Sequence, residues 1–494
     1  MNGNINKALL PVIVVLAILL GAGGMYTGLQ VVGDSSTPVI EQTDPDEEVV
    51  ESSRDISNDV GLSKRNLEKF TNAYEHILKN YFIELEEDTL IEGAIAGMLG
   101  TLEDPYSVYM DEQTAREFME GLDSSFEGIG AEVSMTNGRV TIVAPMRDSP
   151  AEKAGLRPND QIMKVDGEDI EGLSLYEAVL QIRGEKGTTV TLTIQRPGVN
   201  ELLDIDVVRD EIPIITVYSK LFEENGKSIG YIEIRSFGDN AAERVEEELN
   251  EFEKMGIDGL IIDVRGNPGG YLDAVDSIGS LVVPGGEPIV QTENRDGTVT
   301  RFLSNLEEKK PYPIVTLINE GSASASEILA AALKEAGGYD VVGKTTFGKG
   351  TVQQTKGMGD GSQIKLTIFK WLTSDGNFIN EVGVEPTIEV DQPKFFYVSP
   401  INVENTLTFD MNGTQIANAQ LMLEGLGYGP GRTDGYFDET TVEAVRSFQR
   451  DIDIDVTGEI NTETAERLQQ EVISAVQDPE HDLQLKKAIE ILSQ

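Results

Sequence analysis

Short apolar runs alternate with amphipathic stretches between positions 212 and 389 of the chain. The runs are rich in β-branched residues, as buried strands are, whereas apolar residues in the intervening stretches recur at helical spacing. The predicted strands are 228–234, 259–264, 312–319, 339–343, 364–368 and 387–390. The predicted helices are 240–254, 274–281 and 327–336. Such alternation predicts an α/β core, to which we assign residues 201–395.

The N-terminal part of the chain has a different pattern. Residues 8–20 are apolar apart from Pro11, and a lysine precedes them. This run predicts a membrane-spanning signal anchor over 1–27, with the bulk of the chain outside the cytoplasm on the cell-wall side. A cleaved signal peptide is the alternative, but no clean A-x-A site follows. Residues 28–61 are rich in Asp, Glu, Ser and Pro and predict an acidic linker with little to bury.

Residues 62–119 return to a helical pattern. Apolar residues recur at helical spacing at Leu67, Phe70, Ala73, Tyr74, Ile77, Leu78, Leu90, Ile91, Ala94, Ile95 and Met98. The pattern predicts a pair of helices with apolar faces. These faces would pack either on the catalytic part of the chain or on a second copy, so a homo-oligomer is one prediction for this region.

Residues 120–200 form a compact series of short predicted strands. A glycine-rich loop, a turn at 149–156, a helix at 174–182 and a strand at 189–195 follow one another in the order of a PDZ domain, which this region resembles over its whole length. A small β-domain used only for packing is the alternative. PDZ domains add a peptide to a sheet edge and hold its C-terminal carboxylate with loop amides.

The resemblance to a PDZ domain implies a set of peptide-binding residues. The loop that would capture the carboxylate is Gly128, Ile129, Gly130 and Ala131. The residues expected to line the groove are Tyr176, Val179 and Leu180. Arg183, just past the helix, would meet a carboxylate or the next domain, or it is a solvated surface charge.

The C-terminal part of the chain differs again in composition. Residues 404–475 contain short amphipathic helices joined by glycine turns, and their spacing closely resembles a small helical peptidoglycan-binding module. An unrelated protein-docking module is the alternative. Residues 476–494 predict a C-terminal helix, amphipathic and exposed.

Charge and composition exclude several classes of function. The net charge of −47 argues against nucleic acid as a partner. The chain has no cysteine, which excludes disulfides, thiolate catalysis and cysteine metal sites. It has two histidines, His76 and His481, which are too few for a three-histidine zinc site, and it has no H-E-x-x-H motif. We therefore expect neither a metal nor another cofactor.

The turn at 321–326 is the strongest candidate for chemistry. It joins the predicted strand 312–319 to the predicted helix 327–336 and places serine hydroxyls at a helix N-terminus. Unpaired backbone N–H groups and the helix dipole favour negative charge at that point. The alternative is that these serines only cap the helix.

A serine nucleophile needs a base, and both histidines lie outside the predicted core. A lysine serves if burial lowers its pKa. Lys349 lies between two glycines, which allow close approach, whereas its rival Lys344 directly ends a predicted strand. The amide of Ala325 and a glycine-rich turn at 263–270 would supply the two donors of an oxyanion hole.

Three segments carry a close resemblance to a known family. R-G-N-P-G-G at 265–270, S-A-S-A-S-E at 322–327 and F-G-K-G-T-V-Q at 347–353 occur in the order of the carboxyl-terminal processing proteases. That family joins a PDZ domain to a serine–lysine protease core similar to the ββα spiral of crotonases and Clp proteases. The resemblance covers about 62–390. It implies an α/β multi-domain protein with a crotonase/Clp-like core, an inserted PDZ β-domain, N-terminal helices and a small all-α C-terminal module.

The same resemblance assigns roles to individual residues. It implies that Ser324, rather than either neighbouring serine, is the nucleophile and that Lys349, 25 positions further on, is the general base. Gln353 would hold the lysine in place. The residues of the implied oxyanion hole are Gly269, Gly270 and Ala325.

Two other motif matches are set aside. Residues 338–345 match the P-loop expression, but the variable positions look like a strand and no good helix start follows. The S-x-x-K motif of penicillin-binding enzymes is absent, because the third residue after Ser324 is Glu327.

Together these patterns predict a serine endopeptidase of the cell membrane, anchored by a single N-terminal span. Its expected partners are protein substrates with apolar or unfolded C-termini, and peptidoglycan. The alternative is a non-enzymatic scaffold in which a PDZ domain and a wall-binding module flank a degenerate protease core. A wall hydrolase is disfavoured, because no convincing carboxylate pair or metal cluster is present.

Overall fold

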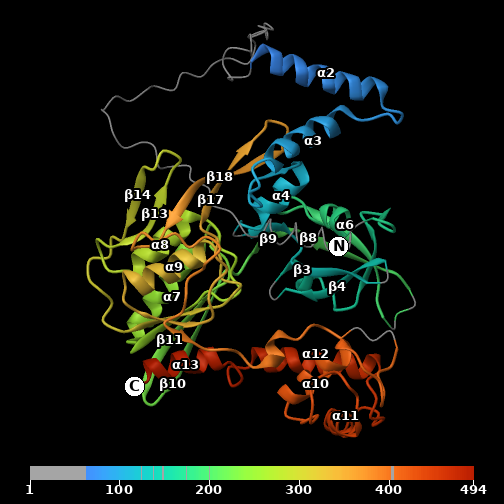
Figure 1. The fold of residues 1–494 in the computed structure, drawn as a ribbon. Coiled ribbons are helices and arrows are strands. Elements are labelled where there is room, and N and C mark those ends of the chain that lie inside the picture. The colour runs from blue at the N-terminus through green and yellow to red at the C-terminus, as the bar shows by residue number, and fades with distance from the viewer. Residues whose placement is uncertain are drawn as a thin grey trace. The chain divides into compact units, whose positions relative to one another are not determined.

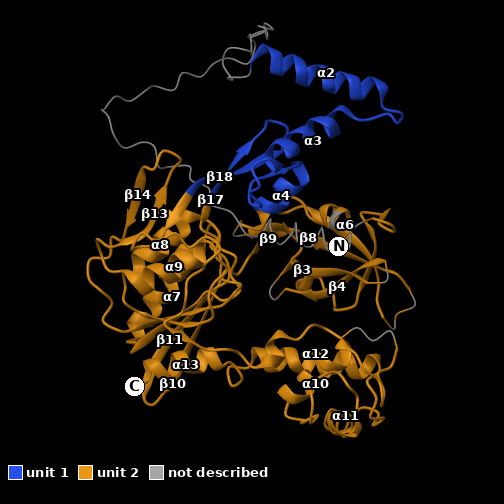
Figure 2. Ribbon diagram, in the orientation of Figure 1, with its two compact units in different colours: residues 1–119, 352–369 blue, residues 120–351, 370–494 orange. Residues whose placement is uncertain are grey.

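The computed structural model describes residues 63–494 apart from 124, 137, 147–148, 174, 198, 200 and 402–404. The predicted anchor and acidic linker lie outside these residues. No helix in the described part of the chain is long and apolar enough to cross a membrane. The chain divides into two compact units, 1–119 with 352–369 and 120–351 with 370–494 (Figure 2). Residues 352–369, which follow the predicted base Lys349 closely in sequence, thus belong to the same unit as the N-terminal region.

The first unit combines three helices with a small sheet. Ser63 caps the first helix by accepting a hydrogen bond from the amide of Asn66 (3.3 Å). The start of one long strand pairs antiparallel with Val108–Met110. The elements are α2 (Lys64–Asn80), α3 (Glu87–Gly100), α4 (Glu112–Glu120), β1 (Val108–Met110), β17 (Thr351–Gly357) and β18 (Gln363–Leu372). No residue of α2 is buried. On its apolar face Leu67, Tyr74 and Leu78 are half-buried, whereas Phe70 and Ile77 are exposed.

The second unit begins with the PDZ-like domain (Figure 1). Its sheet has the order β3-β4-β5-β7-β8, with β6 paired to β5, and a separate ladder joins β2 to β9. The inner face buries an aliphatic core that includes Ile142, Leu192 and Ile194. The strands are β2 (Ser125–Gly128), β3 (Ala131–Thr136), β4 (Arg139–Pro145), β5 (Gln161–Val165), β6 (Glu168–Asp169), β7 (Thr189–Gln195), β8 (Leu203–Val208) and β9 (Asp210–Pro213), and the helices are α5 (Pro150–Lys153) and α6 (Leu175–Ile182). β3 forms an edge of this sheet.

A six-stranded sheet forms the α/β core. Its order is β10-β11-β12-β15-β16-β19, and all its pairs are parallel except β10 with β11. A hairpin of β13 and β14 continues onto the last residues of β18. The strands are β10 (Val217–Glu224), β11 (Lys227–Ile234), β12 (Gly259–Asp263), β13 (Pro288–Glu293), β14 (Val299–Leu303), β15 (Ile314–Ile318), β16 (Asp340–Gly343) and β19 (Ile388–Glu389). The run 338–345 that matched a P-loop is therefore built around a strand.

Helices cover both faces of this sheet. α7 (Ala241–Met255), α8 (Leu272–Val282) and α9 (Ala325–Glu335) follow the strands. Phe252 of α7 lies against Gly230 of β11, whereas the adjacent Ile229 packs with the C-terminal helix α13 (Leu483–Leu492). Because successive strand residues point to opposite faces, α7 and α13 lie on opposite sides of the sheet.

The prediction of an exposed C-terminal helix is wrong. The chain from 478 does form the helix α13, but this helix packs on the core sheet (Figure 1). Leu485, Ala488 and Leu492 are buried against the aliphatic residues Ile229, Ile261, Val315, Leu317 and Val342. The amphipathic pattern identified the apolar face of the helix correctly, but this face supplies the cover that one side of the protease sheet requires.

The C-terminal module is a small helical domain with two similar halves. Gln420 of α10 (Thr414–Gly425) accepts from the Gly435 amide, and its own amide donates to Thr441. Gln449 of α11 (Glu439–Asp451) makes the same pair of contacts with the next turn and with the next helix, α12 (Thr462–Gln477). The short 3-10 helix η2 (Lys394–Tyr397) precedes the module. Buried glutamines thus fix the glycine turns that the sequence suggested.

Candidate active site

Ser324 stands at the turn between β15 and α9. It is the N-cap residue of α9 and has φ 55° and ψ −113°, a conformation that L residues rarely adopt. Such strain typically occurs at functional positions and turns a side chain outward from a tight strand-to-helix turn. Its side chain is partly exposed. The N-cap position therefore does not by itself account for the backbone conformation of this serine.

The two neighbouring serines have structural contacts. Ser322 is fully buried and its hydroxyl donates to the carbonyl of Val264 (2.8 Å). Ser326 is also fully buried and donates to the carbonyl of Asn267 (2.8 Å). Both bonds tie the serine turn to the turn at 263–270. Of the three serines, only Ser324 has a hydroxyl that is neither buried nor engaged with that turn.

The turn at 263–270 passes directly beside Ser324. A Cβ atom built on Gly269 would lie 2.9 Å from Ser324 Cβ and 3.1 Å from the amide nitrogen of Ala325. Only glycine fits there, at φ +108°. Gly270 is equally restricted, since its Cβ would lie 2.3 Å from the Phe237 carbonyl oxygen. The structure thus brings Ser324, Ala325 and Gly269 together.

The amides at this site differ in their partners. The Gly269 N–H donates to the side-chain oxygen of Asn267 (2.8 Å). The N–H groups of Ala325 and Gly270 have no acceptor among the described residues. The Ala325 amide is the first of α9, where the partial positive charge of the helix is greatest.

Glu327 links the serine turn to the loop of Lys349. One oxygen of its fully buried carboxylate, Oε2, accepts from the amides of Ser324 and Lys349, both at 2.8 Å. The other, Oε1, accepts from the amide of Gly348 and the hydroxyl of Thr346, both at 2.6 Å. Burial raises the pKa of Glu327, and the four hydrogen bonds oppose that rise.

Lys349 is fully buried on a rigid loop. Its carbonyl accepts from the indole N–H of Trp371 (2.7 Å), and Gly350 donates to the side-chain oxygen of Asn380 (3.1 Å). Gly348 has φ +89°, with no room for a side chain against the backbone of 381–383. The flanking glycines therefore have the role the sequence suggested, which is to allow close packing around the lysine.

Lys344 lies in a different environment. Its ammonium group pairs with Glu389 (2.8 Å) and Asp391 (3.3 Å). Hydrogen bonds to these carboxylates raise its pKa. A general base needs the opposite shift, so the geometry favours Lys349 over this rival.

Gln353 belongs to the first unit, whereas Lys349 belongs to the second. It lies on β17, is almost fully buried, and donates from its side chain to the hydroxyl of Thr367 (3.0 Å). Its predicted contact with the lysine stays a prediction.

The predicted carboxylate loop lies between β2 and β3. The carbonyls of Ile129 and Gly130 accept from Ala151 and Met146, while the amides of these two residues have no acceptor among the described residues. The side chain of Ile129 is buried in the domain core, so only its backbone is available to a ligand. Gly130 has φ +70°, and a Cβ added to it would lie 2.6 Å from the Cβ of Ser149. Ala131 opens the edge strand β3.

The predicted groove residues lie on α6. Leu180 is 40% exposed and Val179 is half-buried. The backbone at Tyr176 belongs to this helix, while its side chain lies outside the described part of the structure. These placements leave an edge strand and an apolar helix within one domain, as β-augmentation requires.

Arg183 meets a carboxylate. It forms an ion pair with Glu120, and its guanidinium lies 4.8 Å from the centre of the Phe126 ring. The Cγ of Arg183 also lies within 3.6 Å of the position that a Cβ on Gly128 would occupy. Arg183, Glu120 and Phe126 line a cavity of about 560 Å³, together with Leu180 and Asp123.

Two contacts at this site escaped prediction. The role of Glu327 had a local signal, because Ser324 and Glu327 have the spacing of a capping box. The ion pair between Arg265, in the turn at 263–270, and Asp482 had none, since 217 positions separate the two residues.

Four family models match the chain. Peptidase family S41 matches residues 228–390, a PDZ domain matches 128–207, and a putative peptidoglycan binding domain matches 412–468. The model described as the activating protease CtpB N-terminal domain matches residues 18–114. The predictions of a PDZ domain and of a module resembling peptidoglycan-binding domains are thereby confirmed.

Known relatives cover nearly the whole chain. Carboxy-terminal processing protease CtpB of Bacillus subtilis (strain 168) is 46% identical over 99% of this chain and 99% of its own length. Carboxy-terminal processing protease CtpA of the same organism is 40% identical over 86% of this chain and 90% of its own. Among solved structures, the photosystem II D1 C-terminal processing protease is 28% identical over 66% of this chain and 88% of its own, with a TM-score of 0.40.

Proposed function

Because the chain belongs to peptidase family S41 as a carboxy-terminal processing serine protease with a PDZ domain, we propose that Ser324 and Lys349 form its catalytic dyad. The observation that carries this proposal is the pair of hydrogen bonds to Glu327 Oε2, which holds the backbones of both residues on one atom. A nucleophile and its base must keep a fixed mutual geometry.

In the proposed reaction the neutral amine of Lys349 takes the proton of the Ser324 hydroxyl as its Oγ attacks the scissile carbonyl. The amides of Ala325 and Gly270 stabilise the oxyanion; the Gly269 amide, already bonded to Asn267, is the weaker candidate. Lys349 then protonates the leaving amine. In the second half of the reaction Lys349 takes a proton from the water that attacks the acyl-enzyme, and it returns a proton to Ser324 Oγ as the ester bond breaks. Gln353 orients the lysine.

We propose that the PDZ domain selects the substrate. The amides of Ile129 and Gly130 would bind a C-terminal carboxylate, and the peptide would extend along β3 beside Val179, Leu180 and Tyr176. Apolar exposure at Leu180 favours an apolar or unfolded C-terminus. Arg183, next to the loop and already paired with Glu120, is a candidate for sensing that carboxylate.

We propose a site of action outside the cytoplasm. The apolar run at 8–20 would anchor the chain in the membrane, and the C-terminal module would hold it at peptidoglycan, a polymer of the cell wall. The uncovered face of α2, with Phe70 48% exposed and Ile77 43% exposed, supports self-association through the N-terminal helices.

The dyad is tested by cleavage of an unfolded protein with an apolar C-terminus, without added metal or nucleotide. The soluble part of the chain is compared as wild type, Ser324→Ala, Lys349→Ala and the control Lys344→Ala. We expect cleavage by wild type and Lys344→Ala alone. Cleavage by Lys349→Ala would remove this lysine as the base. Inactivity of wild type, persisting after saturation with a C-terminal peptide, would favour the scaffold alternative.

A further inference from the structure

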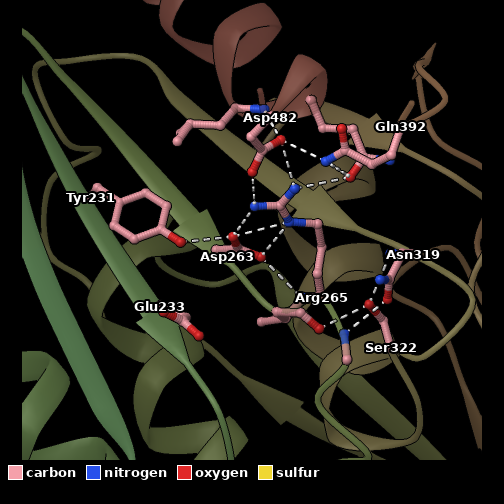
Figure 3. A network of polar contacts seen from close by, with 12 residues as sticks. Tyr231, Glu233, Asp263, Arg265, Asn319, Ser322, Gln392 and Asp482 are labelled. Carbon is pink, nitrogen blue, oxygen red and sulfur yellow. Dashed lines mark hydrogen bonds and ion pairs between the residues drawn. The ribbon is translucent and has the colours of Figure 1, made fainter. Parts of the chain in front are cut away.

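The guanidinium of Arg265 is held from two directions (Figure 3). On one side lies Asp263, the last residue of β12, whose carboxylate accepts from Arg265 Nε (3.0 Å to each oxygen) and from Nη2 (2.6 Å). On the other side, Asp482 accepts from Nη1 (3.0 Å) and Nη2 (2.8 Å), and Gln484 accepts from Nη1 (3.0 Å). A planar guanidinium with two bidentate carboxylates is fixed in both position and orientation.

Asp482 belongs to the N-terminus of α13. It is the N-cap of this helix, and its Oδ1 accepts the amide of Leu485 (2.9 Å). The ion pair with Arg265 is largely shielded from water, since the two side chains are 15% and 13% exposed. Such a pair costs much more to break than a surface pair.

The two chain segments that connect the core to the C-terminal module meet at the same place. Gln392, which follows β19, donates to Asp482 Oδ1 (2.6 Å) and accepts from the amide of Leu483 (3.0 Å). Gln484 donates to the carbonyl of Val390 (2.8 Å). We call Arg265, Asp263, Asp482, Gln392 and Gln484 the Arg265 network.

Short, rigid steps connect this network to the candidate oxyanion hole. The residue after Arg265 is Gly266, whose amide donates to the side chain of Asn319 (2.8 Å) at the end of β15. The fully buried Asn267 then donates from its side chain to the Ile234 carbonyl (2.7 Å) and accepts from the amides of Gly269 (2.8 Å) and Ala323 (3.0 Å). These hydrogen bonds hold the backbone at Gly266 and Asn267, so a displacement of Arg265 would be passed on towards Gly269.

We propose that Asp482 is a positioning residue for catalysis, which holds Arg265 from α13 and so fixes the turn that presents the oxyanion donors. The inference rests on the proposed function of Ser324, Ala325 and Gly270. It assigns the C-terminal helix a part in the reaction, although Asp482 follows the nucleophile Ser324 by 158 positions. Asp482 itself contacts no substrate.

The test uses the complete soluble chain with Asp482→Asn. Asparagine caps helices as well as aspartate does, so α13 keeps its start while the bidentate charge pair is lost. Oxyanion stabilisation contributes to the transition state alone. We therefore expect kcat to fall about tenfold, with KM changed less than twofold, since misplacing a donor is a fraction of the 10²–10³-fold cost of removing it.

A second readout isolates the oxyanion hole. A peptide boronic acid forms a tetrahedral adduct with the serine, whereas the matching product peptide does not. We expect Asp482→Asn to weaken the binding of the boronic acid about tenfold and to leave the affinity for the product peptide unchanged. If the role of Asp482 were purely structural, the substitution would weaken the binding of both ligands or of neither.

The matched control is Leu492→Ala, which removes packing of the same helix without touching the Arg265 network. For Leu492→Ala we expect a lower Tm than for wild type, and an unchanged kcat at assay temperatures below that Tm. If Asp482→Asn keeps the wild-type kcat, or if Leu492→Ala loses kcat to the same extent at an equal loss of Tm, the inference is overturned. Should Asp482→Asn not fold, Arg265→Lys is assayed in the same way, and a wild-type kcat again overturns it. A wild type that fails to cleave would instead overturn the proposed function.

Discussion

At the scale of single residues, a buried carboxylate organises the candidate site. Glu327 accepts hydrogen bonds from four donors, in Ser324, Thr346, Gly348 and Lys349. These hydrogen bonds favour the ionised carboxylate and oppose the burial that raises its pKa. Its charge and its shape are both fixed by these neighbours.

We expect Glu327→Gln to inactivate the enzyme. In the variant an amide nitrogen, which can only donate, replaces one of the two carboxylate oxygens. The two donors that bonded to that oxygen would then be buried without an acceptor, at a cost of roughly 2–4 kcal/mol. Activity should fall about 100-fold, because both proposed catalytic residues lose a common anchor. Peptidase rates and urea unfolding measure both effects. Glu335→Gln, at the last residue of α9 and half-buried, is the control. Equal activity in the two variants would contradict this role.

The close approach of Gly269 to Ser324 gives a second prediction. Gly269→Ala places a methyl group 2.9 Å from Ser324 Cβ and should abolish cleavage. Gly286→Ala also has a positive φ, +83°, but has no atom within 4 Å of the new Cβ. It should cost about 1 kcal/mol of stability and leave kcat unchanged. Similar kcat values for the two variants would show that the contact with Ser324 is unimportant.

The residues of the site differ in how far the sequence could identify them. Ser324, Lys349 and the glycine turns lie in short motifs, where spacing and residue type are informative. Asp482 and Arg265 meet only because α13 returns to the sheet after the C-terminal module. Periodicity reports which face of a helix is apolar but carries no information about what that face packs against. The strands β13 and β14 were also missed; β14 lies at the edge of its sheet and is mostly exposed, so it lacks the buried apolar run by which the core strands were found.

At the scale of elements, β18 contacts the loop of the proposed base at its end and carries an unusual buried cation near its start. Trp371 at the end donates to the carbonyl of Lys349. Lys365, in the first unit, is 1% exposed and its ammonium lies 4.8 Å from the centre of the Phe118 ring. Burial lowers the pKa of Lys365 to about 8, although Asp104 opposes this shift.

The lowered pKa of Lys365 predicts stability that rises with pH. Between pH 8 and pH 10.5 the unfolded chain keeps the proton of this lysine while the folded chain has lost it, so folding is favoured as the pH increases. Lys365→Met should raise the free energy of unfolding at pH 7 by up to about 3 kcal/mol. It should also remove the increase in stability that this lysine causes between pH 8 and pH 10.5. Urea unfolding at pH 7, 8, 9 and 10 measures the difference between variant and wild type.

Lys370→Met serves as the control for that experiment. Lys370 lies on the same strand but its side chain is 55% exposed. Its loss should change neither the stability at pH 7 nor the slope by more than about 0.5 kcal/mol. A Lys365→Met variant with an unchanged slope would show that the ammonium group is better solvated than its burial suggests.

At the scale of the whole molecule, the first unit is discontinuous in sequence. Val108–Met110 pair with Gln363–Lys365, so the N-terminal region is completed by a segment from within the protease sequence. Deleting the N-terminal region would remove β1, one of the partner strands of β18, together with Phe118, and would expose Lys365. Self-association through the N-terminal helices is therefore tested better by point substitutions than by truncation.

We expect the paired change Phe70→Glu and Ile77→Glu to reduce the mass of the particle in solution. Both side chains are exposed on α2, and charges there would prevent two apolar faces from meeting. Size-exclusion chromatography with light scattering measures the mass. Glu68→Lys, at an exposed polar position of α2, is the control. An unchanged mass in the doubly substituted protein would rule out this interface.

The position of α13 late in the chain also has a consequence for the order in which the proposed site is completed during synthesis. A chain is made from its N-terminus onward, and domains fold as their parts become available. The core sheet is complete by Ile388–Glu389, yet one of its faces and one side of Arg265 wait for Leu483–Leu492. A nascent chain thus contains the proposed nucleophile and base, Ser324 and Lys349, well before Asp482, which we propose holds the turn at 263–270 through Arg265. We therefore expect a chain that ends before α13 to cleave its substrate more slowly than the complete chain.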